Sequence, residues 1–77
     1  MDADDSRAAL ERELRQVEAD VAELRRTAAE LREQVGEIGP TDAVERSALI
    51  GQAEEQENLA AELEGRRDEL RQHLGLE

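Results

Sequence analysis

The chain has 77 residues and a formal net charge of −11, from ten basic residues, all of them arginine, and twenty-one acidic ones; it contains no aromatic residue and no cysteine. This composition allows one small domain and excludes a disulfide framework, a thiolate zinc site and a thiol nucleophile. A uniformly acidic surface repels nucleic-acid phosphates and anionic membranes, so we expect neither nucleic acid nor a membrane as a partner.

The first predicted helix is built on an unbroken heptad repeat. Its apolar residues follow gaps of four and three, with Leu10, Val17, Leu24 and Leu31 at heptad position d and Leu14, Val21, Ala28 and Val35 at position a. Such a repeat predicts a long α-helix, from about residue 5 to residue 35, that packs one narrow stripe against another helix. No glycine or proline interrupts this stretch.

A turn is predicted at residues 36–41. Gly36 can adopt the left-handed conformation that ends a helix, and Pro40 cannot continue a helix but can begin one. Asp42, with Glu45 three residues later, matches an Asp form of the capping box that starts a helix. Because so short a connection joins two long helices, we expect an antiparallel hairpin.

The second predicted helix spans about residues 42–74 and ends at Gly75. Its heptad repeat is weaker, with Leu49, Gln56, Leu63 and Leu70 at position d and Ala53, Ala60, Arg67 and Leu74 at position a. Ile50 and Leu59 lie beside this line and widen the apolar stripe, which suits a bundle better than a two-stranded coiled coil. Gly51 and Gly65 fall at the outward position f, where each costs about 1 kcal/mol against alanine.

The predicted fold is therefore all-α: one domain, residues 1–77, that forms a long antiparallel helical hairpin. So small a core, with alanine layers and no aromatic residue, supplies little stability. Dimerisation of two hairpins into a four-helix bundle supplies further burial. A marginal monomer and a helix docked on another protein are the alternatives. The residues predicted to carry self-association are Ile50, Gln56, Leu59 and Arg67.

Several polar groups also have a plain structural explanation. Gln56 fits the edge of a bundle, and Arg67 can extend its guanidinium to the acids of the first helix. His73 suits the negative end of the second helix. A basic patch that can face the acidic part of a second subunit consists of Arg25, Arg26 and Arg32. An acidic run that forms a solvated face, or else a weak contact with a cation or a basic partner, consists of Glu54, Glu55 and Glu57.

The predicted tip of the hairpin carries three acids, Glu37, Asp42 and Glu45. It resembles the N-terminal coiled-coil hairpin of Gre-type transcript-cleavage factors, which has two tip acids spaced Asp-x-x-Glu and then Glu-Glu-Gln in the returning helix. Asp42, Glu45 and residues 54–56 have that spacing, and the opening Leu-x-x-x-Leu-x-x-Val at residues 10–17 is similar. Residues 40–42 also look like the Pro-x-Asp at the tip of DksA-type factors.

The resemblance implies a hairpin that enters the secondary channel of RNA polymerase, where its tip acids help to hold a catalytic Mg²⁺. Leu49 stands where Gre factors usually have a tip aromatic, and neither a zinc-finger cysteine nor the family's C-terminal docking domain occurs in these residues. We see no nucleophile–base pair and no phosphate-binding loop, so no catalytic residue, metal or cofactor is predicted.

The function expected from the sequence is non-enzymatic protein–protein interaction and self-association by a small acidic coiled-coil protein. The alternative is a transcription regulator that binds RNA polymerase through the acidic tip. No purely apolar run is longer than three residues, as at residues 48–50, which is too short for a transmembrane helix or a signal peptide. The expected compartment is therefore the cytoplasm.

Overall fold

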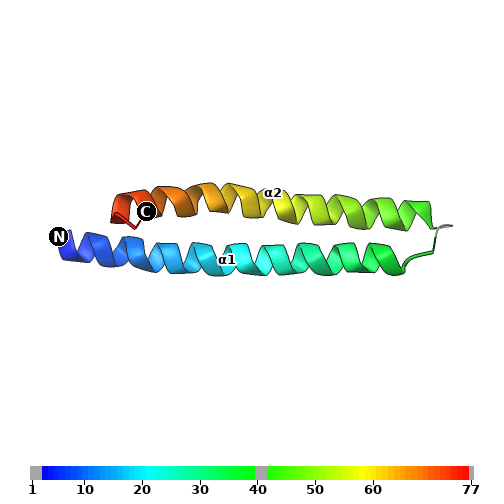
Figure 1. Cartoon of the computed structure of the whole chain (residues 1–77), viewed down its shortest axis with the longest axis horizontal. Coiled ribbons are helices and arrows are strands. Elements are labelled where there is room, and N and C mark those ends of the chain that lie inside the picture. Colours follow the sequence, from blue (N-terminus) through cyan, green and yellow to red (C-terminus); the bar gives the residue numbers. More distant parts are fainter. Residues whose placement is uncertain (1–2, 40–41, 77) are drawn as a thin grey trace.

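The computed structural model describes residues 3–39 and 42–76. Two helices, α1 (Ala3–Glu37) and α2 (Ala43–Leu74), run antiparallel beside each other for most of their length (Figure 1). They form a rod of 61 × 20 × 14 Å. The predicted all-α helical hairpin is thereby confirmed. Neither helix in the described ranges is long and apolar enough to cross a membrane.

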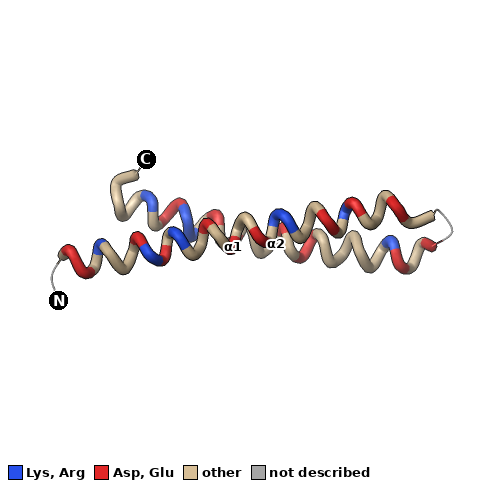
Figure 2. Tube along the Cα trace, turned by 90° about the horizontal axis from the view of Figure 1, so that it is seen from below, with Lys and Arg blue, Asp and Glu red and all other residues tan. Residues whose placement is uncertain are grey.

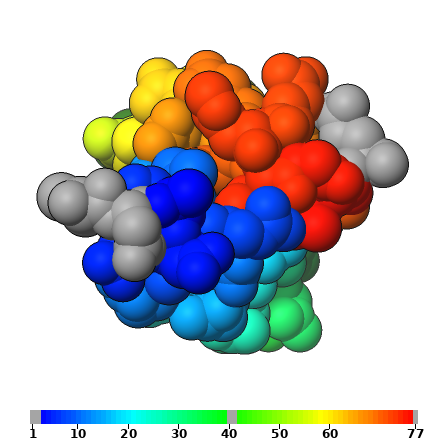
Figure 3. Space-filling model, turned by 90° about the vertical axis from the view of Figure 1, so that its left-hand side faces the viewer, coloured from blue at the N-terminus to red at the C-terminus, as the bar shows by residue number. Residues whose placement is uncertain are grey.

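The hydrophobic core is thickest at the end of the hairpin opposite the turn. Figure 3 views this end, where the first residues of α1 (blue) lie against the last residues of α2 (red). The buried cluster consists of Leu14, Val17, Val21, Leu70 and Leu74, with Leu10 and Leu63 packed against it. Leu70 has no exposed surface. Burial of large aliphatic side chains therefore holds the two helices together mainly at this end.

Nearer the turn the buried residues are alanines. Ala28 is 2% exposed, and Ala53 and Ala60 are fully buried. A methyl group covers little of its neighbours, so the larger side chains of this part stay half-buried, Leu24 and Leu31 among them. The alanines at position a of the heptad repeat thus make this half of the hairpin thin.

One flank of the hairpin is closed by a row of three ion pairs between the helices. These pairs are Glu18–Arg71 at 3.9 Å, Arg25–Glu64 at 2.5 Å and Arg32–Glu57 at 2.7 Å. In each helix the paired residues are seven apart, at position e of the heptad, so they recur on one side of the coil. We name this side the paired flank. Exposed ion pairs stabilise only modestly, but a row of them fixes the register of the two helices.

An arginine from the opposite helix binds the carboxyl end of each helix. Arg46, in the first turn of α2, donates to the carbonyl oxygens of Ile38 and Gly39, both at 3.2 Å. Arg7, near the start of α1, donates to the carbonyl oxygen of Leu74 at 3.2 Å. The Leu74 carbonyl at the end of α2 and the carbonyls just beyond α1 lack intrahelical partners, and each accepts a hydrogen bond from a guanidinium instead.

The end of α1 differs from the sequence-based prediction. Gly36 does not end the helix, because α1 continues past it and the N–H of Ile38 still donates to two carbonyl oxygens of the last turn, at 3.2 and 3.3 Å. Glycine disfavours a helix by about 1 kcal/mol but can adopt helical angles. Gly75 ends α2 as predicted, with φ 70°. Residues 40 and 41 of the predicted turn lie outside the described residues.

Candidate protein-interaction site

The flank opposite the ion-pair row is open in its middle. Next to the core it is closed by the Arg66 guanidinium, which donates to both oxygens of Glu13 at 2.7 and 2.9 Å. One heptad closer to the turn, the same register places Asp20 of α1 beside Leu59 of α2. An acid and a leucine form no ion pair, and a groove of about 370 Å³ lies there. We name this side, which carries heptad positions g and c, the open flank.

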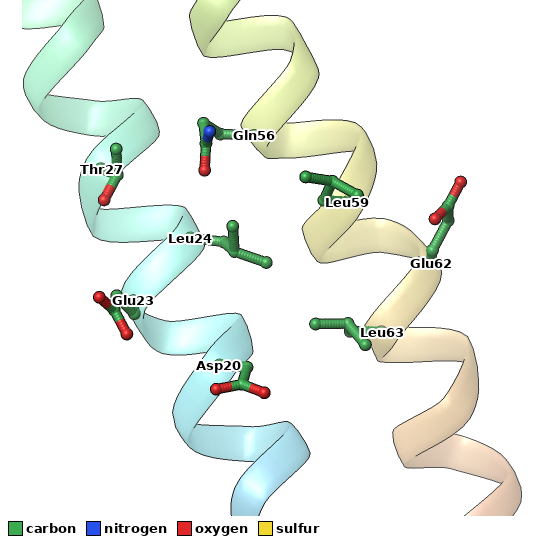
Figure 4. Close-up of a pocket in the computed structure, with 8 residues that line it drawn as sticks. All are labelled: Asp20, Glu23, Leu24, Thr27, Gln56, Leu59, Glu62 and Leu63. Atoms are coloured by element: carbon green, nitrogen blue, oxygen red, sulfur yellow. The ribbon is translucent and has the colours of Figure 1, made fainter.

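The floor of the groove is apolar. In Figure 4, Leu24 of α1 and Leu63 of α2 point towards one another, and Leu59 lies beside them on α2. Leu59 is 43% exposed, whereas the other two leucines are half-buried. Thr27 and Gln56 line the end nearer the turn. The thin alanine core explains the groove, since the fully buried Ala60 behind Leu59 cannot cover these leucines.

Both rims of the groove are acidic. Glu23 of α1 and Glu62 of α2 lie along its edges, and Asp20 lies at its end nearer the core. The rims continue along the hairpin at position c, where the exposed acids are Glu23, Glu30 and Glu37 in α1 and Glu55, Glu62 and Glu69 in α2. Figure 2 shows acidic residues (red) along most of both helices, except for an uncharged stretch of α2 near the turn and the last residues of α2; the helices cross at a shallow angle.

The negative charge is nevertheless unequal between the two flanks. Within residues 11–37 and 47–73, positions c and g carry eight acids and one arginine, a net charge of −7. Positions b and e over the same ranges carry six acids and four arginines, a net charge of −2. The corresponding rims of the paired flank contain Ala22, Ala29 and Ala61. The open flank therefore combines the exposed apolar groove with most of the negative charge.

At the turn, the structure brings two of the three predicted tip acids together. The Asp42 carboxyl lies near that of Glu45 and, through hydrogen bonding and its charge, raises the pKa of Glu45. The predicted capping box is absent, because the Asp42 side chain makes no capping hydrogen bond. Its backbone (φ −106°, ψ 59°) departs from the extended conformation typical of a capping residue. Glu37 is the exposed last residue of α1.

The chain matches no protein-family model, no curated protein and no solved structure. The resemblance to Gre-type and DksA-type hairpins remains a prediction that rests on the tip acids and on the sequence spacing around them.

The residues predicted to carry self-association do not form one surface. Gln56 and Leu59 both line the groove of the open flank. Ile50 occupies position e, seven residues before Glu57, and so lies on the paired flank. Arg67 is half-buried at position a. A partner on the open flank therefore meets two of the four residues.

The prediction that Arg67 reaches the acids of α1 is wrong. Arg67 pairs with Asp68 at 3.0 Å and with Glu64 at 3.9 Å, both in its own helix. The neighbouring Arg66 crosses to α1 instead, because position g borders the facing helix at the surface. The sequence signal for this contact is the pairing of g positions between antiparallel helices.

The predicted basic patch is mostly used inside the hairpin. Arg25 and Arg32 belong to the ion-pair row of the paired flank, so their charges are already paired within the hairpin. The two hydrogen bonds from Arg32, at 2.7 and 2.8 Å, lower the pKa of Glu57. Arg26, at position f, is exposed.

Within residues 3–39 and 42–76, no group of three or more His, Cys, Asp or Glu side chains is arranged to hold a metal ion. His73 is exposed and lines a shallow hollow with Glu69 and Gln72. The apolar groove of the open flank is therefore the stronger candidate for a functional site.

Proposed function

We propose that this chain is a non-enzymatic interaction module whose hairpin supplies two helices of a larger helical bundle. The observation that carries the proposal is the groove of the open flank, where Leu24, Leu59 and Leu63 line an uncovered apolar stripe. A stripe of this kind beside a helix pair is suited to a further packed helix. That helix comes from a second hairpin, which gives the four-helix bundle expected from the sequence, or from another protein.

The thin core supports the same proposal. Over the half of the hairpin near the turn, the buried residues are alanines, and a chain of this size draws little stability from one small core. A helix laid in the groove would cover Leu59, whose side chain is 43% exposed. Binding would therefore add burial at the middle of the hairpin, where the thin half begins.

Site-specific photocrosslinking in the cells that make the chain tests the proposal. A photoreactive amino acid replaces Leu59 in the groove or, as the matched control, the exposed Ala61 on the paired flank. We expect a crosslink from position 59, and not from position 61, to one protein identified by mass spectrometry, a second copy included. Equal labelling from both positions, or no crosslinked product from either, would contradict the proposal.

A second candidate function is regulation of RNA polymerase through the tip of the hairpin. The observation that favours it is the proximity of the Asp42 and Glu45 carboxyls at the tip, where Asp42 makes no capping hydrogen bond. Val44, between them, is 85% exposed. Acids and an exposed apolar side chain at the end of a slender rod suit a contact inside a narrow channel.

Transcription by purified core RNA polymerase tests this candidate. The double variant Asp42→Asn/Glu45→Gln is expected to lose any effect on transcription while keeping its helical circular dichroism. Glu33→Gln, which removes an exposed acid one turn before the end of α1, serves as the control and should keep the effect. Wild-type protein that neither binds the polymerase nor changes its products would remove this candidate.

A further inference from the structure

We infer that the open flank binds a basic amphipathic helix of another protein in preference to a second copy of this chain. The inference rests on the proposed function and adds the chemistry of the partner. It is carried by the position of an apolar groove between two acidic rims.

The groove has the dimensions of a helix contact. Its lining runs from Asp20 to Thr27 in α1 and from Gln56 to Leu63 in α2, which is about 10 Å along each helix. Two or three apolar side chains of a partner helix, spaced i, i+4 and i+7, cover such a length. Leu59 supplies the exposed apolar contact, and the half-buried Leu24 and Leu63 supply the floor.

The rims select the charge of the partner. Within the part of the chain that the structure describes, Glu23, Glu30, Glu55 and Glu62 form no ion pair. On the paired flank, by contrast, each acid of the ion-pair row already has its arginine. A helix that carries lysine or arginine beside its apolar face would place those cations against the unpaired rims, which is the usual charge pattern between packed helices.

A second copy of the chain fits this flank poorly. In a two-fold symmetric dimer the same surface of each copy meets its equivalent. Positions c and g of one copy, with a net charge of −7, would then face the same positions of the other copy, which also carry −7. The apolar gain against this repulsion comes mainly from Leu59, since the other two leucines are already half-buried. Like charges brought together across an interface disfavour that partner.

Two synthetic helical peptides test the inference. Each has about three heptads and the same leucine stripe; one carries lysine beside the stripe and the other carries glutamate. Fluorescence anisotropy at about 0.15 M salt measures binding to the full chain. We expect the lysine peptide to bind at least about tenfold more tightly than the glutamate peptide.

Matched variants separate groove binding from general attraction to an acidic protein. Leu59→Glu adds one acid to the open flank but removes the apolar contact, so it should weaken binding of the lysine peptide by about tenfold or more. Ala61→Glu adds the same charge to the paired flank and should leave the affinity unchanged. Leu59→Ala, with no added charge, provides a second test of the same contact. Circular dichroism checks that each variant is as helical as the wild type.

Three results would overturn the inference. The first is equal binding of the two peptides, and the second is an affinity for the lysine peptide that neither Leu59 variant weakens. The third is a wild-type dimer in sedimentation equilibrium that Leu59→Glu dissociates, since the occupant is then a second copy. In this third case the proposed function stands and only the choice of partner fails. The proposed function is tested separately: it is contradicted if photocrosslinking from position 59 gives no product.

Discussion

At the scale of single residues, Leu70 is the side chain on which the hairpin most depends. It is the largest fully buried side chain among the described residues and lies in the main cluster. We predict that Leu70→Ala lowers the free energy of unfolding by about 2–5 kcal/mol, which is as much as so small a core supplies. Urea unfolding followed by circular dichroism measures this loss. Leu59→Ala, at a 43% exposed position, should lower the free energy of unfolding by about 1 kcal/mol or less. Equal losses in the Leu70 and Leu59 variants would mean that Leu70 does not lie in the main core.

The heptad repeat predicted which residues face the other helix, but not how deeply each one is buried. Leu63 and Leu70 both occupy position d, yet Leu70 is buried and Leu63 is half-buried on the groove. The difference depends on the residues that surround each leucine in three dimensions, large at one end of the hairpin and alanine near the middle. For the same reason the sequence did not show that Arg66, rather than Arg67, crosses to α1.

At the scale of the element, α2 contains two glycines that the hairpin itself does not require. A Cβ atom added at Gly51 or Gly65 meets no other atom within 4 Å. We predict that alanine at either position raises the free energy of unfolding by about 0.5–1 kcal/mol, because glycine is the poorer helix former. Thermal melts followed by circular dichroism measure the gain.

Gly75 provides the opposite control, because its φ of 70° is one that alanine adopts poorly. Gly75→Ala should therefore lower the stability by about 1 kcal/mol. A loss of stability in Gly51→Ala or Gly65→Ala would show that these positions touch something beyond the hairpin, such as a partner helix.

The ends of the helices show where local sequence signals are sufficient. Gly75 was correctly predicted to end α2, because the chain adopts the left-handed conformation there. Gly36 was not a stop, because α1 continues through it to Glu37. Asp42 was correctly placed at the start of α2, but the capping box was wrong, since a sequence motif does not set the backbone angles that point a side chain at the helix amides.

At the scale of the whole molecule, the distribution of charge depends on the fold. Divided along the chain, residues 1–37 have a net charge of −5 and residues 38–77 have −6, which suggests an even surface. Divided by flank, the charges are −7 and −2, and the more negative flank is the one with the apolar groove. Only the pairing of the two helices brings the c and g positions together. The proposed interaction site was therefore not visible in the composition, although Gln56 and Leu59 had been singled out.

This charge distribution predicts how stability depends on salt and pH. Acids on the open flank repel one another at neutral pH, and salt screens that repulsion. The raised pKa of Glu45 also makes the fold more stable in mild acid, because the folded chain binds this proton more tightly than the unfolded chain. The stabilisation from protonated Glu45 is complete below the unfolded pKa of this carboxyl and is lost as the pH rises through its raised folded pKa. We therefore predict that the melting temperature rises with added salt, and also on acidification from neutral pH to about pH 5.

Further acidification should reverse the gain. The arginine partners lower the pKa values of Glu13 and Glu57 in the folded chain. Their stabilising effect is present above the unfolded pKa and is lost as the pH falls through the lowered folded pKa. Glu45→Gln should accordingly raise the melting temperature at neutral pH and reduce its increase on mild acidification. Glu57→Gln should lower the melting temperature at neutral pH and reduce its decrease in strong acid. Melts at several pH values and salt concentrations measure each effect. A wild-type melting temperature that changes with neither salt nor mild acid would show that the acids are already neutralised across an interface, and in a purified sample that interface joins two copies of this chain.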